Sequence, residues 1–256
     1  MFTHNIVRHF VWLTAIFFAG MILLWTEGCQ KASVADCFLS TGKIIKVERP
    51  VGGFHTVVLK DNVNLFLRQA DTDGLIVEAG SNLMNKIYTD VRDSVLFIGN
   101  NNSCNWVRSY KKLVNVYLDF IRLDSLEYRS VGDVRNQDTL RLDSLKIEVH
   151  EGAGLIALTV DVNEIHTNLH YGTADIKISG KCVLSYVYSA GFGRIDNRDL
   201  EAMQIYADNR SSNDMYLHAV QVLAVTIHNI GNIYYTGNPE KIDLKRLGSG
   251  ELIKLE

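Results

Sequence analysis

Four aspartates, Asp175, Asp196, Asp199 and Asp214, recur near equivalent positions of a repeating sequence and are the first candidates for chemistry. Glycoside hydrolysis requires two carboxyl groups about 5–10 Å apart, because one acts as the general acid and the other as base or nucleophile. Aspartates at such positions also cap turns, since a short carboxylate can accept hydrogen bonds from nearby backbone amides. We adopt the turn-capping interpretation and predict no catalytic residue.

The eight histidines raise the question of a metal site. His150, His170 and His228 each end an expected strand, and stacking could bring His150 and His170 together. Such histidines are more often solvated residues at strand ends. The chain also has no His-Glu-x-x-His, no Gly-x-Ser-x-Gly and no phosphate-cradling glycine loop before a helix. The sequence therefore predicts no metal ion and no cofactor.

Tyrosines are the stronger candidates for binding, because seven of them fall in consecutive repeats. In an alternating strand several must point outward, and exposed tyrosines beside Asn and Asp can bind glycans or protein strands by stacking and hydrogen bonding. The alternative, that they merely cover the strand faces, stays open. The expected binding surface consists of Tyr186, Tyr188, Tyr206, Tyr216 and Tyr234.

The first 28 residues have the character of an export signal. Residues 10–25 carry no charge and are followed closely by Gly28-Cys29. This uncharged run suits a signal-peptide core and is shorter than the ~20 residues that span a bilayer. Gly28-Cys29 resembles the cleavage site of a bacterial lipoprotein, in which the cysteine is acylated, although Thr26 and Glu27 are atypical there. We predict a signal peptide at 1–28, a lipidated Cys29 and a tether at 29–45.

Charge and cysteine content narrow the class of function. The formal net charge of −3 argues against nucleic acid as a partner, since neutralising phosphates requires a basic face. Cys37, Cys104 and Cys182 form no metal pattern and no disulfide framework, and one bridge of unassigned pairing could form among them. We expect a lipid-anchored protein of the cell envelope. No acidic tag follows Cys29, so we favour the periplasmic side of the outer membrane, with surface exposure as the alternative.

A repeat of about twenty residues occupies the chain from Ser130 to Glu256 and must position these side chains. Its apolar strand segments begin at residues 145, 165, 184, 203, 223 and 242, which are 20, 19, 19, 20 and 19 residues apart. A fixed short period indicates a solenoid, in which stacking of turns supplies the core. A second apolar column, with glycines shortly before most of its members, comprises Val134, Ile156, Ile176, Ile195, Met215, Ile233 and Leu252.

Alternation within the repeat predicts strands whose inner faces include Ile147, Val225 and Ile227. The linkers are uneven within a turn yet repeat between turns, which favours a coil over an antiparallel meander. Because parallel crossovers are right-handed, we predict an all-β, right-handed parallel β-helix. The third turn is ambiguous: either Leu184, Tyr186 and Tyr188 point inward, or a slip of one residue turns Val183, Ser185 and Val187 inward.

The N-terminal half of the mature chain is less regular. Residues 82–88 could form one or two helical turns, and polar residues 100–112 a projecting loop. No boundary rich in Pro, Gly or Ser is present, so we treat 46–256 as a single domain with irregular N-terminal turns; a separate N-terminal sandwich is the alternative. Short apolar or alternating runs start at Ile44, Phe54, Val63, Leu75, Val95 and Val114, separated by Asp, Asn and Gly.

Several of these features resemble the head GIN domain family, whose members are auto-transporter adhesin-like proteins common in Bacteroidetes. The resemblance rests on the lipoprotein leader, on residues 54–59, 77–83 and 95–98, and on glycine turns at 172–176 and 193–195. It covers roughly residues 48–240 and implies a right-handed β-helix and an envelope location. These motifs are structural, so the resemblance supplies no catalytic residue.

We therefore predict a non-catalytic envelope lipoprotein that presents a repetitive β-helical surface for adhesion or assembly, with a glycan or an envelope protein as partner. One alternative is a carbohydrate-active β-helix enzyme, a polysaccharide lyase or hydrolase, which carboxylates gathered in one groove would favour. The other is a self-assembling envelope scaffold. The oligomeric state stays open.

Overall fold

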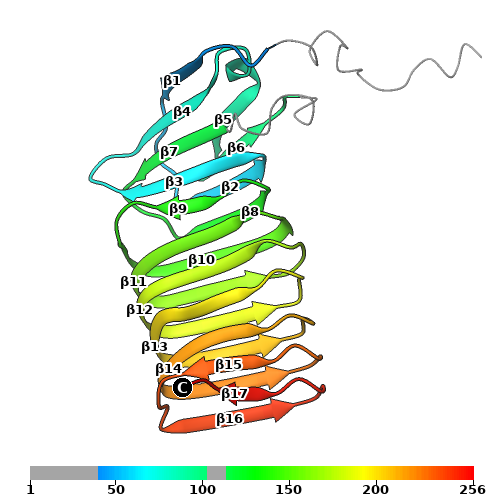
Figure 1. The fold of residues 1–256 in the computed structure, drawn as a ribbon. Helices are drawn as coiled ribbons and strands as arrows, with labels where there is room; N and C mark the ends of the chain where they lie inside the picture. The colour runs from blue at the N-terminus through cyan, green and yellow to red at the C-terminus, as the bar shows by residue number, and fades with distance from the viewer. Residues whose placement is uncertain (1–39, 103–113) are drawn as a thin grey trace, which may run out of the picture. The chain divides into compact units, whose positions relative to one another are not determined.

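The computed structural model describes residues 40–102 and 114–256, which form a β-solenoid (Figure 1). Within these described ranges, seventeen strands join in one hydrogen-bonded sheet around an apolar core. The predicted signal peptide, Cys29, Cys37, Cys104 and most of the predicted loop at 100–112 lie outside the described residues. Within the described ranges, no helix has the length and apolar character needed to cross a membrane.

The C-terminal strands follow one another in parallel, as the twenty-residue period predicts. Five long strands pair each with the next one along the chain. The last of them pairs near its start with one shorter strand and near its end with another. The long strands are β10 (Leu140–Gly152), β11 (Leu155–Leu169), β12 (Asp175–Ser189), β13 (Ile195–Asn209) and β14 (Met215–Ile227); the shorter ones are β15 (Ile233–Thr236), β16 (Lys241–Arg246) and β17 (Leu252–Lys254), which pairs with β15.

In β11, β12 and β13 the alternation of buried and exposed residues shifts by one residue near the middle of the strand. We call the parts of each turn before and after this shift its first half and its second half. In the third turn Ser185 and Val187 point inward, while Val183 at this shift is 51% exposed. The register is thus the slipped one, with Tyr186 and Tyr188 outward. The second apolar column is confirmed in full: Val134, Ile156, Ile176, Ile195, Met215, Ile233 and Leu252 are successive partners in the first halves.

The N-terminal strands belong to the same sheet, which confirms irregular first turns of one stack. They are β1 (Ile44–Arg49), β2 (Thr56–Asp61), β3 (Val63–Gln69), β4 (Gly74–Gly80), β5 (Ile87–Arg92), β6 (Val95–Asn100), β7 (Val114–Phe120), β8 (Ser125–Ser130) and β9 (Val134–Asn136), with a 3-10 turn at Met84–Lys86. Ser40 and Thr41, within the predicted tether, already contact the fold: the Asn82 side-chain amide donates to the Ser40 carbonyl, and Thr41 is buried.

These first turns do not stack in the order of the sequence. Strand β2 lies between β6 and β8, and β3 lies between β7 and β9, all in parallel. The β2–β3 turn is therefore inserted between the β6–β7 and β8–β9 turns. Beyond them, β4 pairs antiparallel with β7 and β1, and β5 antiparallel with β6, so that this end of the described unit differs from the parallel stack.

Candidate ligand-binding groove

The structure places the five expected tyrosines in two groups. Tyr186, Tyr188 and Tyr206 lie in the second halves of β12 and β13. Tyr216 and Tyr234 lie in the first-half column, on β14 and β15, where they are in register with each other. The repeat carries a signal that separates these groups, because Tyr216 and Tyr234 directly follow Met215 and Ile233 of the second apolar column.

The first group contains an aromatic column across successive strands. Tyr186 is in register with His166 on β11 and with Tyr206 on β13, so the three outward side chains follow one another along the stack. The ring centroids of His166 and Tyr186 are 4.6 Å apart, and those of Tyr186 and Tyr206 are 5.6 Å apart. The next position of the column is Ala224, whose small side chain leaves the face of Tyr206 uncovered on that side.

A polar column runs beside the aromatic one, two residues further along each strand. It consists of Asn168, Tyr188, Asp208, Thr226 and Lys245, which are in register from β11 to β16. Asp208 Oδ2 lies 3.1 Å from Arg210 Nη2, and its Oδ1 lies 3.2 Å from His228 Nε2. The hydrogen bond from Arg210 to Asp208 raises the pKa of Arg210. This ion-paired carboxylate is thereby fixed in place as a hydrogen-bond acceptor.

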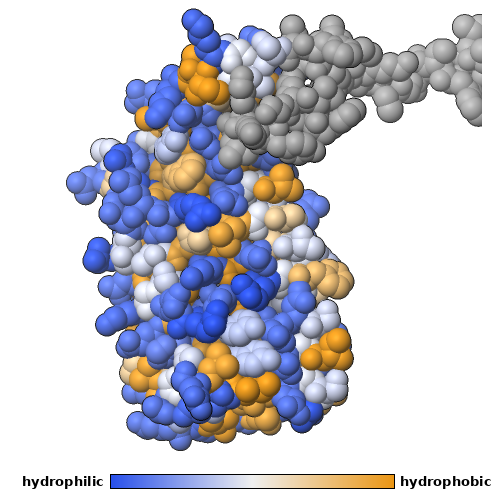
Figure 2. Space-filling view, in the orientation of Figure 1, coloured by the Kyte–Doolittle hydropathy of each residue, from blue (hydrophilic) through white to orange (hydrophobic). Residues whose placement is uncertain are grey.

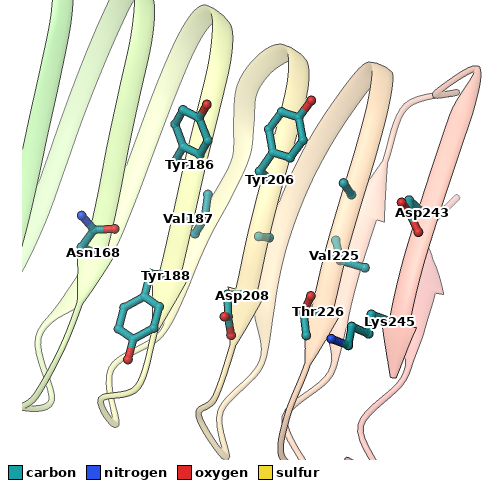
Figure 3. A pocket seen from close by; sticks show the side chains of 12 residues that line it. Asn168, Tyr186, Val187, Tyr188, Tyr206, Asp208, Val225, Thr226, Asp243 and Lys245 are labelled. Carbon is teal, nitrogen blue, oxygen red and sulfur yellow. The ribbon is translucent and has the colours of Figure 1, made fainter. Parts of the chain in front are cut away.

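Between the two columns lies an open groove with a volume of about 480 Å³ (Figure 3). Figure 3 shows Tyr186 and Tyr206 along one rim, with Tyr188, Asp208 and Thr226 along the other. The strand segments at the buried Val187, Ala207 and Val225 form its floor. The groove crosses β11, β12, β13, β14 and β16, which at about 4.8 Å per strand amounts to roughly 19 Å.

The second tyrosine group is already covered by other side chains. The rings of Tyr216 and Tyr234 stack with centroids 5.0 Å apart. The guanidinium of Arg198 lies 4.6 Å from the centroid of Tyr216, and Arg198 in turn binds Asp196 with a closest approach of 2.6 Å. The hydrogen bonds from Arg198 hold the pKa of Asp196 below its ordinary value, against the opposing effect of burial. Tyr216 therefore offers little free ring surface to a ligand.

The four candidate aspartates serve the fold. Oδ1 of Asp175 accepts the backbone N–H of Arg194, and Oδ1 of Asp214 accepts that of Asn232, so each caps the corner of the next turn. Asp199 lies 3.1 Å from Lys177 Nζ, and Asp196 binds Arg198. The turn-capping interpretation is confirmed for Asp175 and Asp214. None of these four carboxylates lines the groove.

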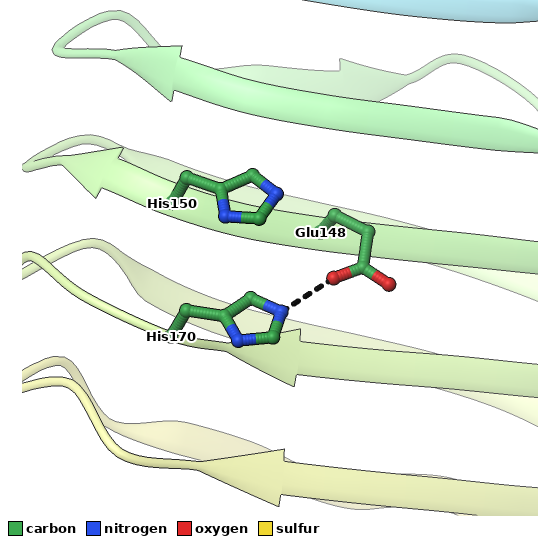
Figure 4. Close-up of side chains that lie close together, drawn as sticks. All are labelled: Glu148, His150 and His170. Atoms are coloured by element: carbon green, nitrogen blue, oxygen red, sulfur yellow. Dashed lines mark hydrogen bonds and ion pairs between the residues drawn. The ribbon is translucent and has the colours of Figure 1, made fainter.

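A further cluster lies at strand ends, on Glu148, His150 and His170 (Figure 4). The two imidazole rings are nearly parallel, with an interplanar angle of 6° and centroids 4.8 Å apart. Glu148 Oε2 lies 2.6 Å from His170 Nε2. Oε1 of the same carboxylate accepts hydrogen bonds from the Lys146 ammonium group and the Asn168 side-chain amide. Burial opposes ionisation of Glu148, but these hydrogen bonds outweigh it and lower the pKa of Glu148. His150 and His170 thus lie together, as stacking of the turns allowed, whereas Glu148 was not foreseen.

Comparison with known proteins relates this fold to one family. The family model described as "Putative auto-transporter adhesin, head GIN domain" matches residues 53–239. A structure described as a putative adhesin from Bacteroides fragilis is 22% identical, with a TM-score of 0.75, and the match covers 83% of this chain and 97% of that one. A structure described as a putative lipid binding protein from Parabacteroides distasonis is 19% identical, with a TM-score of 0.64 and coverages of 85% and 98%. No curated protein matches this chain.

Proposed function

This chain belongs to the head GIN domain family of auto-transporter adhesin-like proteins, and from that premise we propose that it is a non-catalytic adhesin of the cell envelope. Its ligand would be an extended glycan bound in the groove between the aromatic and polar columns. The observation that carries this proposal is the pairing of those columns, which places the uncovered face of Tyr206 beside the acceptor Asp208 in one groove.

The chemistry of the groove suits sugar rings. Tyrosine faces pack against the apolar face of a sugar, and the neighbouring polar groups can exchange hydrogen bonds with its hydroxyls. Asp243 and Lys245 at the β16 end carry opposite charges, so no strong field of one sign selects a highly charged ligand. Equal strand spacing favours a ligand that is itself extended and repetitive.

The groove supports binding better than hydrolysis. A glycosidase requires two carboxyl groups free to exchange protons and to approach the sugar from opposite sides. Of the two carboxylates that line the groove, Asp208 is engaged by Arg210 and His228. Hydrolysis or elimination of a polysaccharide by the purified protein would contradict the non-catalytic proposal.

Binding can be tested with the purified chain lacking residues 1–28 on a glycan array, followed by titration of any hit. Tyr206→Ala should weaken binding by about 2- to 12-fold, which corresponds to the ~0.5–1.5 kcal/mol typical of one aromatic contact, and Tyr186→Ala with Tyr206→Ala should weaken it further. Tyr216→Ala is the matched control, because it removes a stacked tyrosine outside the groove. No glycan binding, or equal loss in the control, would sink the proposal.

The envelope location is proposed from the adhesin-like family and the leader, with lipid on Cys29 as the anchor. Metabolic labelling with a fatty-acid analogue should mark the protein, and Cys29→Ser should abolish the label. Persistence of the label in Cys29→Ser would contradict lipidation at this residue. Protease treatment of whole cells distinguishes the outer-membrane face: we expect protection, as for a periplasmic orientation, and cleavage would indicate surface display.

A further inference from the structure

We propose that Glu148, His150 and His170 form a binding site for a divalent transition-metal ion such as Zn²⁺. The proposal does not depend on the glycan groove, since none of the three ligands lines it; Asn168, which does line the groove, contacts this cluster only through Glu148. It reverses the expectation from sequence that the chain binds no metal. The three residues come from two neighbouring turns, and only the pairing register of β10 and β11 shows that their side chains meet.

The parallel register brings the three residues to one place. Val149 on β10 pairs with Leu169 on β11, and both are buried, so the next residues of the two strands, His150 and His170, both point outward as neighbours. Glu148 lies two residues before His150 on β10 and therefore shares its outer face. Figure 4 shows the two rings one above the other, with the carboxylate of Glu148 beside them.

The distances between the ligand atoms suit a single ion after a small adjustment. One nitrogen of each histidine and one carboxylate oxygen all lie within 4.8 Å of one another. Zinc binds nitrogen and carboxylate oxygen at about 2.0–2.2 Å, which in a tetrahedral site separates neighbouring ligand atoms by about 3.4 Å. To bind one ion, the side chains would have to rotate so that the widest separation closes by up to about 1.4 Å and the 2.6 Å contact between Glu148 and His170 opens. The site is partly sheltered, because the side chain of Glu148 is only 13% exposed.

The donor set selects the class of metal. Two imidazole nitrogens and one carboxylate suit Zn²⁺, Cu²⁺ or Ni²⁺, whereas Mg²⁺ and Ca²⁺ prefer oxygen ligands alone. Three protein ligands leave the fourth tetrahedral position to water or another small ligand.

The neighbours of Glu148 leave one oxygen available for the metal. Oε1 is engaged by Lys146 Nζ at 2.7 Å and by the Asn168 amide at 2.9 Å. Among the residues that the structure describes, Oε2 contacts His170 alone, so an ion would replace that contact and bind both atoms. Lys146 and Asn168 would then orient the carboxylate from outside the metal sphere, although the charge of Lys146 opposes a cation.

The test is a titration of the tag-free chain lacking residues 1–28 with Zn²⁺, by calorimetry and by competition with a chromogenic chelator. We expect one equivalent of Zn²⁺ to bind, and His150→Gln and His170→Gln each to weaken it about tenfold or more. The matched control is His228→Gln, because His228 ends a later strand and pairs with Asp208 outside the cluster. Urea unfolding verifies that each variant is folded, and Co²⁺ absorption reports on the coordination geometry of the bound ion.

The outcomes decide the proposal in either direction. Stoichiometric binding that both cluster variants weaken and the control retains supports the site. Absence of binding at millimolar Zn²⁺ would overturn it, as would binding that survives in His150→Gln and His170→Gln. Equal weakening by His228→Gln would place the ion elsewhere and would also overturn it.

Discussion

Among the described residues, Thr167 is one of two, with Asn197, that have a buried side-chain polar atom without a hydrogen-bond partner. It is fully buried in the inner ladder between Ile147 and Val187, and its hydroxyl has no hydrogen-bond partner. Leaving a buried polar group unsatisfied costs about 1–3 kcal/mol. Thr167→Val replaces the hydroxyl by a methyl group of similar shape, so we expect the free energy of unfolding to rise by about 1 kcal/mol in urea titrations. The outward Thr226→Val is the control, and a loss of stability in Thr167→Val would contradict this account.

Asp196 gives the stability of the protein a dependence on pH. Arg198 lowers the pKa of Asp196 in the folded state, so the stabilising contribution is present above the unfolded carboxyl pKa of about 4 and is lost as pH falls through the lower folded value. Asp196→Asn should therefore reduce the free energy of unfolding at pH 7, by less than about 1 kcal/mol because Arg198 is 42% exposed. The difference from the unsubstituted protein should shrink in urea titrations near pH 3. A difference that grows on acidification would refute the assignment.

At the scale of the element, neighbouring residues in the second half of β14 point to opposite faces of the strand. Val225 is 3% exposed and continues the inner ladder, whereas Thr226 belongs to the outward polar column. A buried unpaired carboxylate costs several kcal/mol against a typical total stability of ~5–15 kcal/mol. Val225→Asp should therefore unfold the C-terminal turns, as seen in loss of the strand signal by circular dichroism, while Thr226→Asp stays folded. The reverse result would shift the register by one residue.

For the described unit as a whole, the out-of-order stacking of the first turns depends on a close contact at Gly132. A Cβ at Gly132 would clash with the backbone of Val63 and Asn64, where the β8–β9 turn rests on the inserted β2–β3 turn. The Tyr128 hydroxyl also donates to the carbonyl of Gly132 and is buried, which raises the pKa of Tyr128 to about 12.

Gly132→Ala should accordingly destabilise the protein by at least about 1–3 kcal/mol, the usual cost of overpacking, as measured by urea unfolding. Gly52→Ala is the matched control, because the nearest atom to its Cβ would be 4.0 Å away. If both variants unfold at the same urea concentration, the β8–β9 turn does not rest on β2–β3 as the structure shows.

The sequence by itself determined the repeat, the strands and the inner faces of the turns other than the third, where two registers stayed open. Alternation at period two predicts which side chains are buried. The recurrence of Val134, Ile156 and Ile176 at near-constant spacing predicts that successive turns stack. Both are local or periodic properties, so they can be predicted without knowing the neighbour of any particular strand. The family resemblance, which the match over residues 53–239 confirms, rests on the same structural motifs.

Only the tertiary structure decided which strands are neighbours and which outward side chains meet. A strand such as β2 buries the same face whether it stacks on the next turn or on a later one, so its alternation does not reveal that β6 and β8 flank it. Likewise, outward residues bury little apolar surface, so their types do not reveal which of them are neighbours. The groove beside Tyr206 and the meeting of Glu148 with His170 follow from exact register between turns, which side-chain periodicity does not encode.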